Sequence, residues 1–196
     1  MTHGACIGEA KRLLRREALA RRRSLSAEEN KAFSERIAAR LLTLDAYREA
    51  RTIFAFASMA DEVQLYGFME SALAAGKSIG VPLVMGKGSM EAARVRTLAD
   101  LVPGDFGILT VRAVGRVLLP PESLDLVLVP GAAFSREGAR LGLGAGFYDR
   151  FLSERAPAAQ RVAVAFSCQI TAAVPVEPHD MMMQQIVTEK EIIRCR

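Results

Sequence analysis

Apolar side chains recur with a helical period along the first part of the chain. Over residues 9–23 they stand three or four positions apart, which predicts an amphipathic helix. The sequence Ser26-Ala27-Glu28-Glu29 has the form of a capping box and predicts the start of a second helix. The inward faces are expected to carry Leu13, Leu14, Ala18 and Leu19 in the first helix and Phe33, Ile37 and Leu41 in the second.

Short apolar segments farther along the chain predict β-strands. They lie at residues 52–57, 77–84, 92–95, 124–129, 161–166 and 185–188. The segment 124–129 is nearly continuous in apolar residues, as expected of a central parallel strand covered on both faces. Between the first two strands, the polar residues 58–62 indicate the entry into a helix that ends at Gly76. That helix is expected to contain Leu65, Phe68, Met69 and Leu73.

Strands that alternate with helices favour an α/β fold with three layers, α/β/α. We expect an open, mainly parallel sheet with helices on both faces, formed by a single domain over residues 1–196. In such sheets ligands bind beyond the carboxyl ends of the strands. The loops after Ala57, Val84, Val129 and Phe166 are therefore the expected places for a binding site.

Composition narrows the class of protein. The longest apolar stretches are too short to cross a bilayer, and the basic amino-terminal residues are not followed by an apolar segment, so we expect a cytoplasmic protein without a membrane partner. Cys6, Cys168 and Cys195 are widely spaced and suggest neither a disulfide framework nor a zinc site. With only His3 and His179 available, histidine-based triads and multi-histidine metal sites are disfavoured.

Basic residues are concentrated at the amino-terminal end of the chain. Residues 1–23 hold seven of them against two acidic ones, although the net charge of the whole chain is only +4. This distribution suits a polyanionic small molecule, an acidic lipid surface or a nucleic acid. Lys11 and Arg15 lie on one helix face and are candidate ligand contacts, or else part of a solvated face. Most of the run Arg21 to Arg23 is expected to be solvated.

A glycine-rich stretch, residues 130–152, follows the predicted central strand. Its glycines, at positions 131, 138, 142, 144 and 146, precede Phe147 to Leu152, which have helical spacing. Glycines let a backbone approach phosphate oxygens, and N–H groups at a helix amino end bind anions. Arg140 suits phosphate and Asp149 suits Mg²⁺. The stretch therefore predicts a phosphate-binding loop, with an ordinary turn as the alternative.

These residues resemble the 5-formyltetrahydrofolate cyclo-ligase family, and the resemblance spans nearly the whole chain. It is carried, in order, by Lys11-Arg12-Leu13-Leu14-Arg15, Ser58-Met59-Ala60-Asp61-Glu62, Gly76-Lys77, Val129-Pro130-Gly131-Ala132-Ala133-Phe134, the segment from Arg140 to Asp149, His179-Asp180 and Ile186-Val187-Thr188-Glu189. Several landmarks in the same order are far more specific than the glycine-rich loop alone.

The resemblance implies an enzyme that uses ATP and Mg²⁺ to convert 5-formyltetrahydrofolate into 5,10-methenyltetrahydrofolate. ATP would phosphorylate the formyl oxygen, N10 would attack the activated carbon, and ADP and phosphate would be released. By similarity, the catalytic residues would be Arg140 and Asp149, and the metal ligands Asp149 and Asp180. ATP would contact Lys11, Arg15, Arg140, Gly142, Gly144, Gly146 and Tyr148, and folate would contact Ala57, Glu62, Leu143 and Phe147.

Some alternatives remain open at the level of the sequence. The chain departs from the family pattern at Leu143, Ala145, Phe147 and Gln184, which also fits a catalytically weak regulatory relative that binds nucleotide and folate. A nucleic-acid partner is not expected, because aromatic residues make up only 6% of the chain. Glu62 could instead cap a helix, and the Phe147 and Tyr148 rings could serve packing. The protein is expected to be a monomer or a homodimer.

Overall fold

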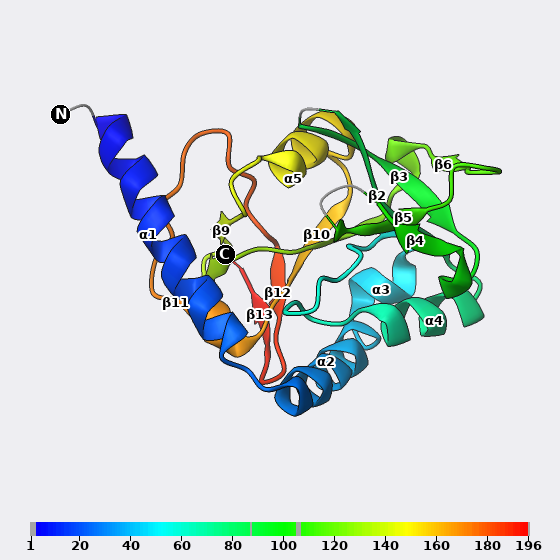
Figure 1. The fold of residues 1–196 in the computed structure, drawn as a ribbon, viewed down its shortest axis with the longest axis horizontal. Helices are drawn as coiled ribbons and strands as arrows, with labels where there is room; N and C mark the ends of the chain where they lie inside the picture. Colours follow the sequence, from blue (N-terminus) through cyan, green and yellow to red (C-terminus); the bar gives the residue numbers. More distant parts are fainter. Residues whose placement is uncertain (1–2, 87, 105–106, 196) are drawn as a thin grey trace.

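The fold is described from a computed structural model, which covers residues 3–86, 88–104 and 107–195, with side chains from residue 7 onward. The α-helices are α1 (His3–Arg23), α2 (Ala27–Leu41), α3 (Asp45–Glu49), α4 (Tyr66–Ala74) and α5 (Phe147–Arg150). A π-helical turn, η4 (Phe151–Arg155), continues α5. The helices surround a central sheet (Figure 1).

The central sheet has eight strands in the order β13-β12-β10-β7-β1-β2-β3-β6. Neighbouring strands from β12 to β2 are parallel, and the outer pairs are antiparallel. The strands are β1 (Thr52–Phe54), β2 (Ser78–Gly86), β3 (Ser89–Val95), β6 (Leu118–Leu119), β7 (Leu126–Val129), β10 (Gln160–Val164), β12 (Gln185–Val187) and β13 (Ile192–Arg194).

Two small sheets lie outside the central one. The first has the order β11-β8-β9 and is formed by β8 (Ala133–Ser135), β9 (Arg140–Leu141) and β11 (Ile170–Thr171). The second is a hairpin of β4 (Leu101–Pro103) and β5 (Leu109–Val111). Helical turns of the 3-10 type occur at η1 (Leu98–Asp100), η3 (Pro121–Ser123) and η5 (Ser167–Gln169).

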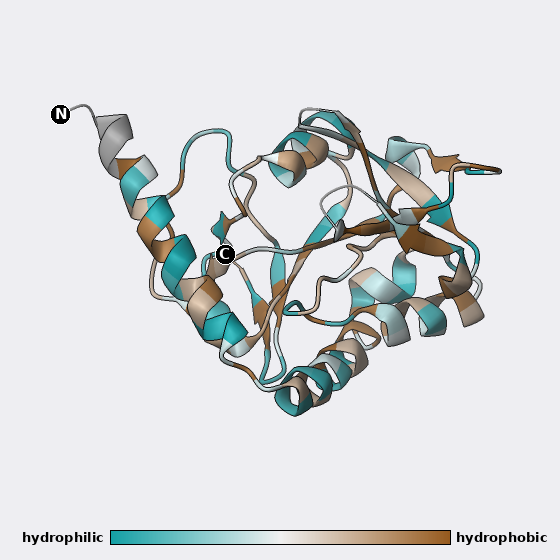
Figure 2. Ribbon diagram, in the orientation of Figure 1, coloured by the Kyte–Doolittle hydropathy of each residue, from teal (hydrophilic) through white to brown (hydrophobic). Residues whose placement is uncertain are grey.

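Apolar residues on both faces of the sheet explain why the central strands are covered on each side. On one face, Ile37, Leu41, Phe68 and Met69 from α2 and α4 are fully buried against the sheet. On the other face, α5 and η4 cover the sheet, and Phe54 of β1 stacks on Phe151 with 4.8 Å between ring centroids. Hydrophilic residues gather on the outward sides of the helices (Figure 2). The predicted three-layer α/β fold is confirmed.

Helix α1 lies beside the layers, against the β11-β8-β9 sheet (Figure 1). Its Ala18 is fully buried in a small cluster that includes Ala133 and Leu141. Leu13, which was expected to face inward, is 36% exposed, so this prediction was wrong. The small sheet offers α1 only a narrow apolar contact, and a helix that packs through a narrow stripe leaves its flanking apolar residues outside.

The sheet reverses its direction of growth between β1 and β7. The chain passes from β1 to β2 on one side and later returns through β7 on the other side. At such a switch point, the loops that leave the two strands diverge and open a crevice beyond their carboxyl ends. The segments after Phe54 and Val129 therefore form the floor of a natural binding site.

The structure differs from the sequence-based expectation in three segments. The segment 98–123, for which no helix or strand was predicted, contains β4, β5 and β6. The expected loop over residues 130–146 includes the β8–β9 hairpin, so the glycine loop proper is residues 142–146. Helix α4 begins at Tyr66, later than expected, because residues 58–65 form a separate loop. In the part of the chain that the structure describes, no helix combines the length and the hydropathy needed to span a bilayer.

Phe54 connects the sheet to the helical layer beneath the binding site, so its removal should destabilise the protein strongly. Its side chain is 0% exposed, and a Phe54→Ala substitution should lower the free energy of unfolding by about 3–5 kcal/mol because a large cavity forms. Val114 is 94% exposed, and Val114→Ala should change it by less than about 0.5 kcal/mol. Urea denaturation of both variants measures the difference, and equal effects would contradict the packing described.

Candidate functional site

A pocket of about 490 Å³ opens at the carboxyl ends of β1, β2 and β7. Its walls come from α1, the loop after β1, the β2–β3 hairpin, the glycine loop with α5, and residues 177–180. All four connections expected at the site therefore contribute to its lining, and the one after Phe166 does so through Glu177, His179 and Asp180. In that same connection, the buried Gln169 supports the floor by donating to the carbonyl of Gly131 over 2.8 Å.

The glycine loop, residues 142–146, forms one rim of the pocket. Gly144 and Gly146 have φ angles of 110° and 68°, which a residue with a side chain adopts only with strain. Within the described structure, no group accepts a hydrogen bond from the backbone N–H groups of residues 143–146. These donors are therefore available to an anion. The N–H groups of the loop would be the main attraction for a phosphate here. The helix dipole contributes less, because α5 has only four residues.

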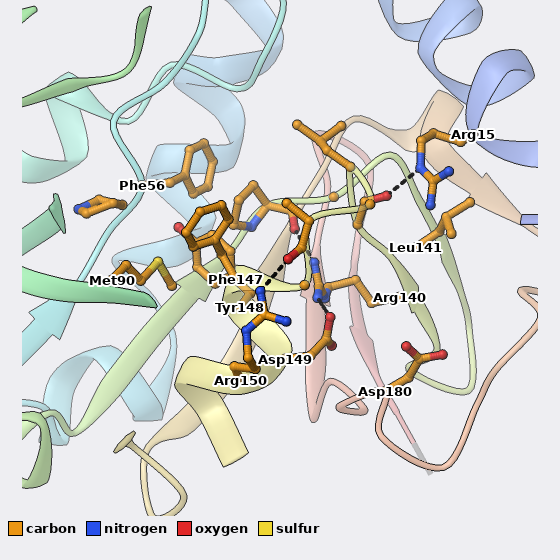
Figure 3. A pocket seen from close by; sticks show the side chains of 18 of the residues that line it. Arg15, Phe56, Met90, Arg140, Leu141, Phe147, Tyr148, Asp149, Arg150 and Asp180 are labelled. Atoms are coloured by element: carbon orange, nitrogen blue, oxygen red, sulfur yellow. Dashed lines mark hydrogen bonds and ion pairs between the residues drawn. The ribbon is translucent and has the colours of Figure 1, made fainter. Parts of the chain in front are cut away.

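Two arginines hold the glycine loop from opposite sides. Arg15 of α1 donates its Nε–H to the Gly142 carbonyl over 2.8 Å. Arg150 of α5 donates to the carbonyls of Ala145 and of Gly88, in the β2–β3 turn. Figure 3 shows both guanidinium groups near the loop. The loop is thereby fixed to α1 and to the β2–β3 hairpin, and the terminal nitrogens of Arg15 lie close to Gly144.

Arg140 lies beneath the glycine loop. Its side chain is only 4% exposed and donates to the Asp149 carboxylate over 2.7 Å and to the Pro130 carbonyl over 3.2 Å (Figure 3). Its Nε–H is buried without a partner among the described residues. Sequence reasoning placed Arg140 at the head of the loop for direct phosphate contact, whereas the structure shows it paired with Asp149 at the wall of the pocket.

Asp149 and Asp180, the predicted metal ligands, are brought into neighbouring segments. Asp149 accepts a hydrogen bond from the backbone N–H of Met181, the residue that follows Asp180, over 3.2 Å. Both residues line the pocket. Among the described residues there is no group of three or more acidic, histidine or cysteine side chains arranged to hold a metal ion. The two carboxylates could hold a metal only together with ligands from another source.

Lys11 is held by two carboxylates at the opposite wall. Its Nζ donates to Asp180 over 2.6 Å and to Glu177 over 2.8 Å. Burial acts to lower the pKa of Lys11, but its hydrogen bonds with Asp180 and Glu177 outweigh burial and raise it. Burial tends to raise the pKa of Asp180, but the hydrogen bond from Lys11 outweighs burial and lowers it. Both groups are therefore charged at neutral pH, and Lys11 is not part of a solvated face.

An apolar wall completes the pocket on the side of the β2–β3 hairpin. Phe56 and Met90 lie near Phe147 and Tyr148 of α5 (Figure 3), and Ala57 also lines the pocket. The Tyr148 hydroxyl is buried without a partner among the described residues, and burial raises its pKa above the usual value. Its ring lies 6.2 Å from that of Phe54, so Tyr148 takes part in packing as well as lining the pocket. This wall suits a flat, largely apolar ligand.

Glu62 is the carboxylate within this otherwise apolar side. It lines the pocket, is 7% exposed and accepts a hydrogen bond from the Met59 N–H over 3.0 Å. Burial raises the pKa of its carboxyl, against the lowering effects of Met59 and Arg22. The alternative that Glu62 caps a helix was wrong, because the N-cap position of α4 is Leu65 and has no side-chain cap.

Sequence reasoning missed several charged residues at or beside the site, among them Arg150, Glu177 and Arg22. Arg22 belongs to a run that was expected to be mostly solvated, but it is 3% exposed and contacts Asp61 and Glu62. Its position could have been found from helical spacing, because it lies four residues after the buried Ala18. Glu177, the second partner of Lys11, carries no comparable signal, since it stands in an irregular segment far along the chain.

The departures from the family pattern lie in different places. Leu143 is 52% exposed on the glycine loop, where it lines the rim of the pocket together with Ala145. Gln184 does not line the pocket, and its side chain accepts from the Arg161 N–H beside β12. Gln184 therefore serves the sheet, and only the changes on the glycine loop and α5 concern the ligand.

Comparison with known proteins gives one consistent result. The sequence model of the 5-formyltetrahydrofolate cyclo-ligase family matches residues 7–189. The Escherichia coli K12 5-formyltetrahydrofolate cyclo-ligase is 30% identical over 88% of this chain and 96% of its own length. The mouse protein of the same name is 31% identical over 93% of this chain and 95% of its own.

Solved structures agree with the sequence relatives. The NMR structure of Aquifex aeolicus 5,10-methenyltetrahydrofolate synthetase superposes with a TM-score of 0.83 at 33% identity, covering 95% of this chain and 93% of that one. A synthetase from Mycoplasma pneumoniae, at 22% identity and a TM-score of 0.74, shares the fold over 91% of this chain and 98% of its own. These comparisons define the protein as a ligase of the cyclo-ligase class. The chain belongs to the 5-formyltetrahydrofolate cyclo-ligase family.

The raised pKa of Glu62 predicts a pH-dependent effect on stability. The folded chain binds the Glu62 proton more tightly than the unfolded chain does, so this residue weakens the fold as pH rises through its unfolded pKa of about 4.3. Glu62→Gln removes this effect. The Tm of the variant relative to the parent protein should therefore increase between pH 4 and pH 7.

Scanning calorimetry at several pH values tests this expectation, with Glu70→Gln on the exposed side of α4 as the control. The control should show no such trend. If the relative Tm of Glu62→Gln instead falls with rising pH, the Glu62 carboxylate is net stabilising and the described balance is incorrect.

Proposed function

We propose that this protein converts 5-formyltetrahydrofolate into 5,10-methenyltetrahydrofolate, with ATP as co-substrate and ADP and phosphate as products. One observation carries the proposal: two different surfaces meet in a single pocket. One is the glycine loop, which is flanked by cations, and the other is an apolar wall that contains the buried Glu62 carboxylate. The loop side fits a polyphosphate and the wall fits a pterin ring. The family membership of the chain supports the same reaction.

The proposed chemistry proceeds in two steps. The γ-phosphoryl group of ATP passes to the formyl oxygen on N5, and ADP is released. The lone pair of N10 then attacks the formyl carbon, N10 gives up its proton, and the bond from carbon to the phosphorylated oxygen breaks to release phosphate. Phosphoryl transfer depends on positioning and charge neutralisation, so it needs cations and oriented N–H groups more than a protein nucleophile.

Lys11, Arg15 and the glycine loop would hold the ATP phosphates. Lys11 is already charged and fixed at the pocket, and the terminal nitrogens of Arg15 lie near Gly144. The free amides of residues 143–146 add donors between these two cations. Arg140 would act through Asp149, whose carboxylate it orients, with its unpartnered Nε–H facing the same wall. Preorganised charges of this kind stabilise the charge that develops in the transition state.

Mg²⁺ would be held by Asp149 and Asp180 together with ATP. Mg²⁺ in nucleotide sites takes one or two carboxylates, and phosphate oxygens and waters supply its remaining ligands. Two carboxylates on neighbouring segments fit that chemistry, and the lowered pKa keeps Asp180 ionised. The bound metal would neutralise charge on the phosphates.

The folate would lie between Ala57, Phe147 and Leu143, with Glu62 as an acceptor for its polar ring edge. Tyr148, expected near ATP, would shape the wall between the two substrates, because its hydroxyl is buried.

The single-domain organisation, the cytoplasmic location and the monomeric or dimeric state stay predictions.

Asp149→Asn should test the assignment of the metal and of the catalytic pair. Loss of one carboxylate charge weakens both Mg²⁺ binding and the ion pair with Arg140, so kcat/KM should fall roughly 10- to 100-fold. The assay follows methenyl absorbance in the presence of 5-formyltetrahydrofolate, ATP and Mg²⁺, and addition of EDTA should abolish the signal. Asp45→Asn, at an exposed position on α3, is the matched control and should retain full activity.

A fully active Asp149→Asn variant would show that the metal assignment is wrong. Absence of product from the parent protein at any pH near neutral would refute the proposed reaction. If ATP or folate then raised the Tm without release of ADP, the regulatory relative would be the better description.

Lys11→Met should weaken ATP binding selectively. The substitution removes a charge-assisted contact to phosphate and leaves the folate wall intact, so the KM for ATP should rise at least about tenfold while the KM for folate changes little. Lys31→Met, on the exposed face of α2, is the control. Steady-state kinetics with each substrate varied in turn makes the comparison. An equal rise in both KM values would contradict the separate placement of the two substrates.

A further inference from the structure

The loop that carries Glu62, residues 58–65, is held to α2 through its backbone. Asn30 donates to the Glu62 carbonyl over 3.2 Å, and the Ser34 hydroxyl accepts from the Gln64 N–H over 2.9 Å. The Ser58 hydroxyl closes the loop on itself by donating to Val63. These contacts fix the path of the chain. They leave the direction of the Glu62 carboxylate to other groups.

Arg22 reaches the Glu62 carboxylate from the end of α1. Its guanidinium donates to Asp61 Oδ2 from Nη2 over 2.8 Å and from Nε over 3.3 Å, and to Glu62 Oε1 from Nη1 over 3.5 Å. The Arg22 and Glu62 side chains are 3% and 8% exposed. The remaining oxygen of Glu62 accepts the Met59 N–H. One buried cation is thus shared by two adjacent carboxylates, of which only Glu62 lines the pocket.

The sharing of Arg22 is unequal, and its consequences for the two carboxylates differ. Burial tends to raise the pKa of Asp61, but the short contact with Arg22 outweighs it, and the pKa of Asp61 is lowered. The pKa of Glu62 is raised, chiefly by burial and further by the negative charge of Asp61. Arg22 acts to lower this pKa but does not outweigh the other two effects. Without Arg22, the buried carboxylate of Glu62 would lie beside the partly exposed carboxylate of Asp61 with no buried cation to offset their repulsion, which is unfavourable.

Few other charged or titratable groups reach Glu62. Within the described structure they are the phenols of Tyr66 on α4 and Tyr148 on α5, beside Arg22 from α1 and Asp61 from its own loop. Both phenols have raised pKa values through burial and stay neutral near neutral pH. Arg22 is therefore the group that favours the ionised form of Glu62 from outside its own loop.

We propose that Arg22 is a positioning residue for substrate binding, which holds the Glu62 carboxylate ionised and directed into the pocket as an acceptor for the folate. This inference rests on the proposed function, in which Glu62 contacts the folate ring. Asp61 has a matching role: it anchors the Arg22 guanidinium, and by pairing with it limits how strongly Arg22 stabilises the ionised form of Glu62. The pair of residues thus sets the pH range over which the pocket accepts its folate substrate.

The experiment measures the pH profile of kcat/KM for 5-formyltetrahydrofolate at saturating ATP, because that profile reports ionisations of the ATP-bound enzyme before folate binds. In Arg22→Gln the acid limb should move to higher pH and the KM for folate should rise roughly tenfold near neutral pH. The KM for ATP should change less than about twofold, because Arg22 does not line the pocket. Arg23→Gln is the matched control, since Arg23 is exposed and contacts only Asp61, and its profile should match that of the parent.

Asp61→Asn should move the acid limb of the pH profile in the opposite direction. It removes the like charge beside Glu62 and leaves Arg22 in place, so the acid limb should move to lower pH. A role of Arg22 in stability alone would not move the two variants in opposite directions. If Arg22→Gln does not fold, Asp61→Asn and the charge-conserving Arg22→Lys carry the test, and Arg22→Lys should keep the acid limb within the range of the parent.

The inference is overturned if the acid limb stays unmoved in Asp61→Asn, or if Arg22→Gln raises the KM values for ATP and folate equally. These outcomes are distinct from a failure of the proposed function. If the parent protein forms no methenyl product, the proposed function fails, whereas an active parent with unmoved acid limbs refutes only the role of Arg22.

Discussion

The packing of α1 against the β11-β8-β9 sheet is the constraint on which the functional site depends. Four residues on one face of the helix, Lys11, Arg15, Ala18 and Arg22, have different neighbours. Ala18 makes the apolar contact that fixes the helix. The three cations then meet the carboxyl-terminal acidic segment, the glycine loop and the loop after β1. The docking of this one helix therefore sets the position of three charges at or beside one pocket.

Three of the cations at the site are paired with carboxylates before any ligand is present, whereas Arg15 donates to the Gly142 carbonyl. Lys11 is neutralised by Asp180 and Glu177, Arg140 by Asp149, and Arg22 by Asp61 and Glu62. Pairing lets ionised groups persist in a poorly solvated pocket, where isolated charges would change their protonation state. A polyanion with a divalent cation can exchange partners with such pairs without changing the net charge of the site by much. The pocket is thus both charged and stable when empty.

The sequence predicted the central strands and the location of the glycine loop well, because both depend on local patterns. The fully buried β7 followed by glycines is an example. It did not predict the β8–β9 hairpin, whose strands of three and two residues are too short for periodicity to show. The contact of Arg22 with Glu62 joins residues 40 positions apart, and its charge suggested solvent. Burial of a charged residue depends on a partner that only the tertiary fold supplies.

The contact between Lys11 and Asp180 spans 169 positions, nearly the full length of the chain. During synthesis on the ribosome the basic face of α1 emerges long before its acidic partners, which lie 166 and 169 positions farther along the chain. Contacts of such long range also form late in folding, since much of the chain must be ordered before they close. A partly made or carboxyl-terminally truncated chain would therefore expose a row of unpaired cations. The binding site is therefore complete only after a segment far along the chain has been made and has packed against α1.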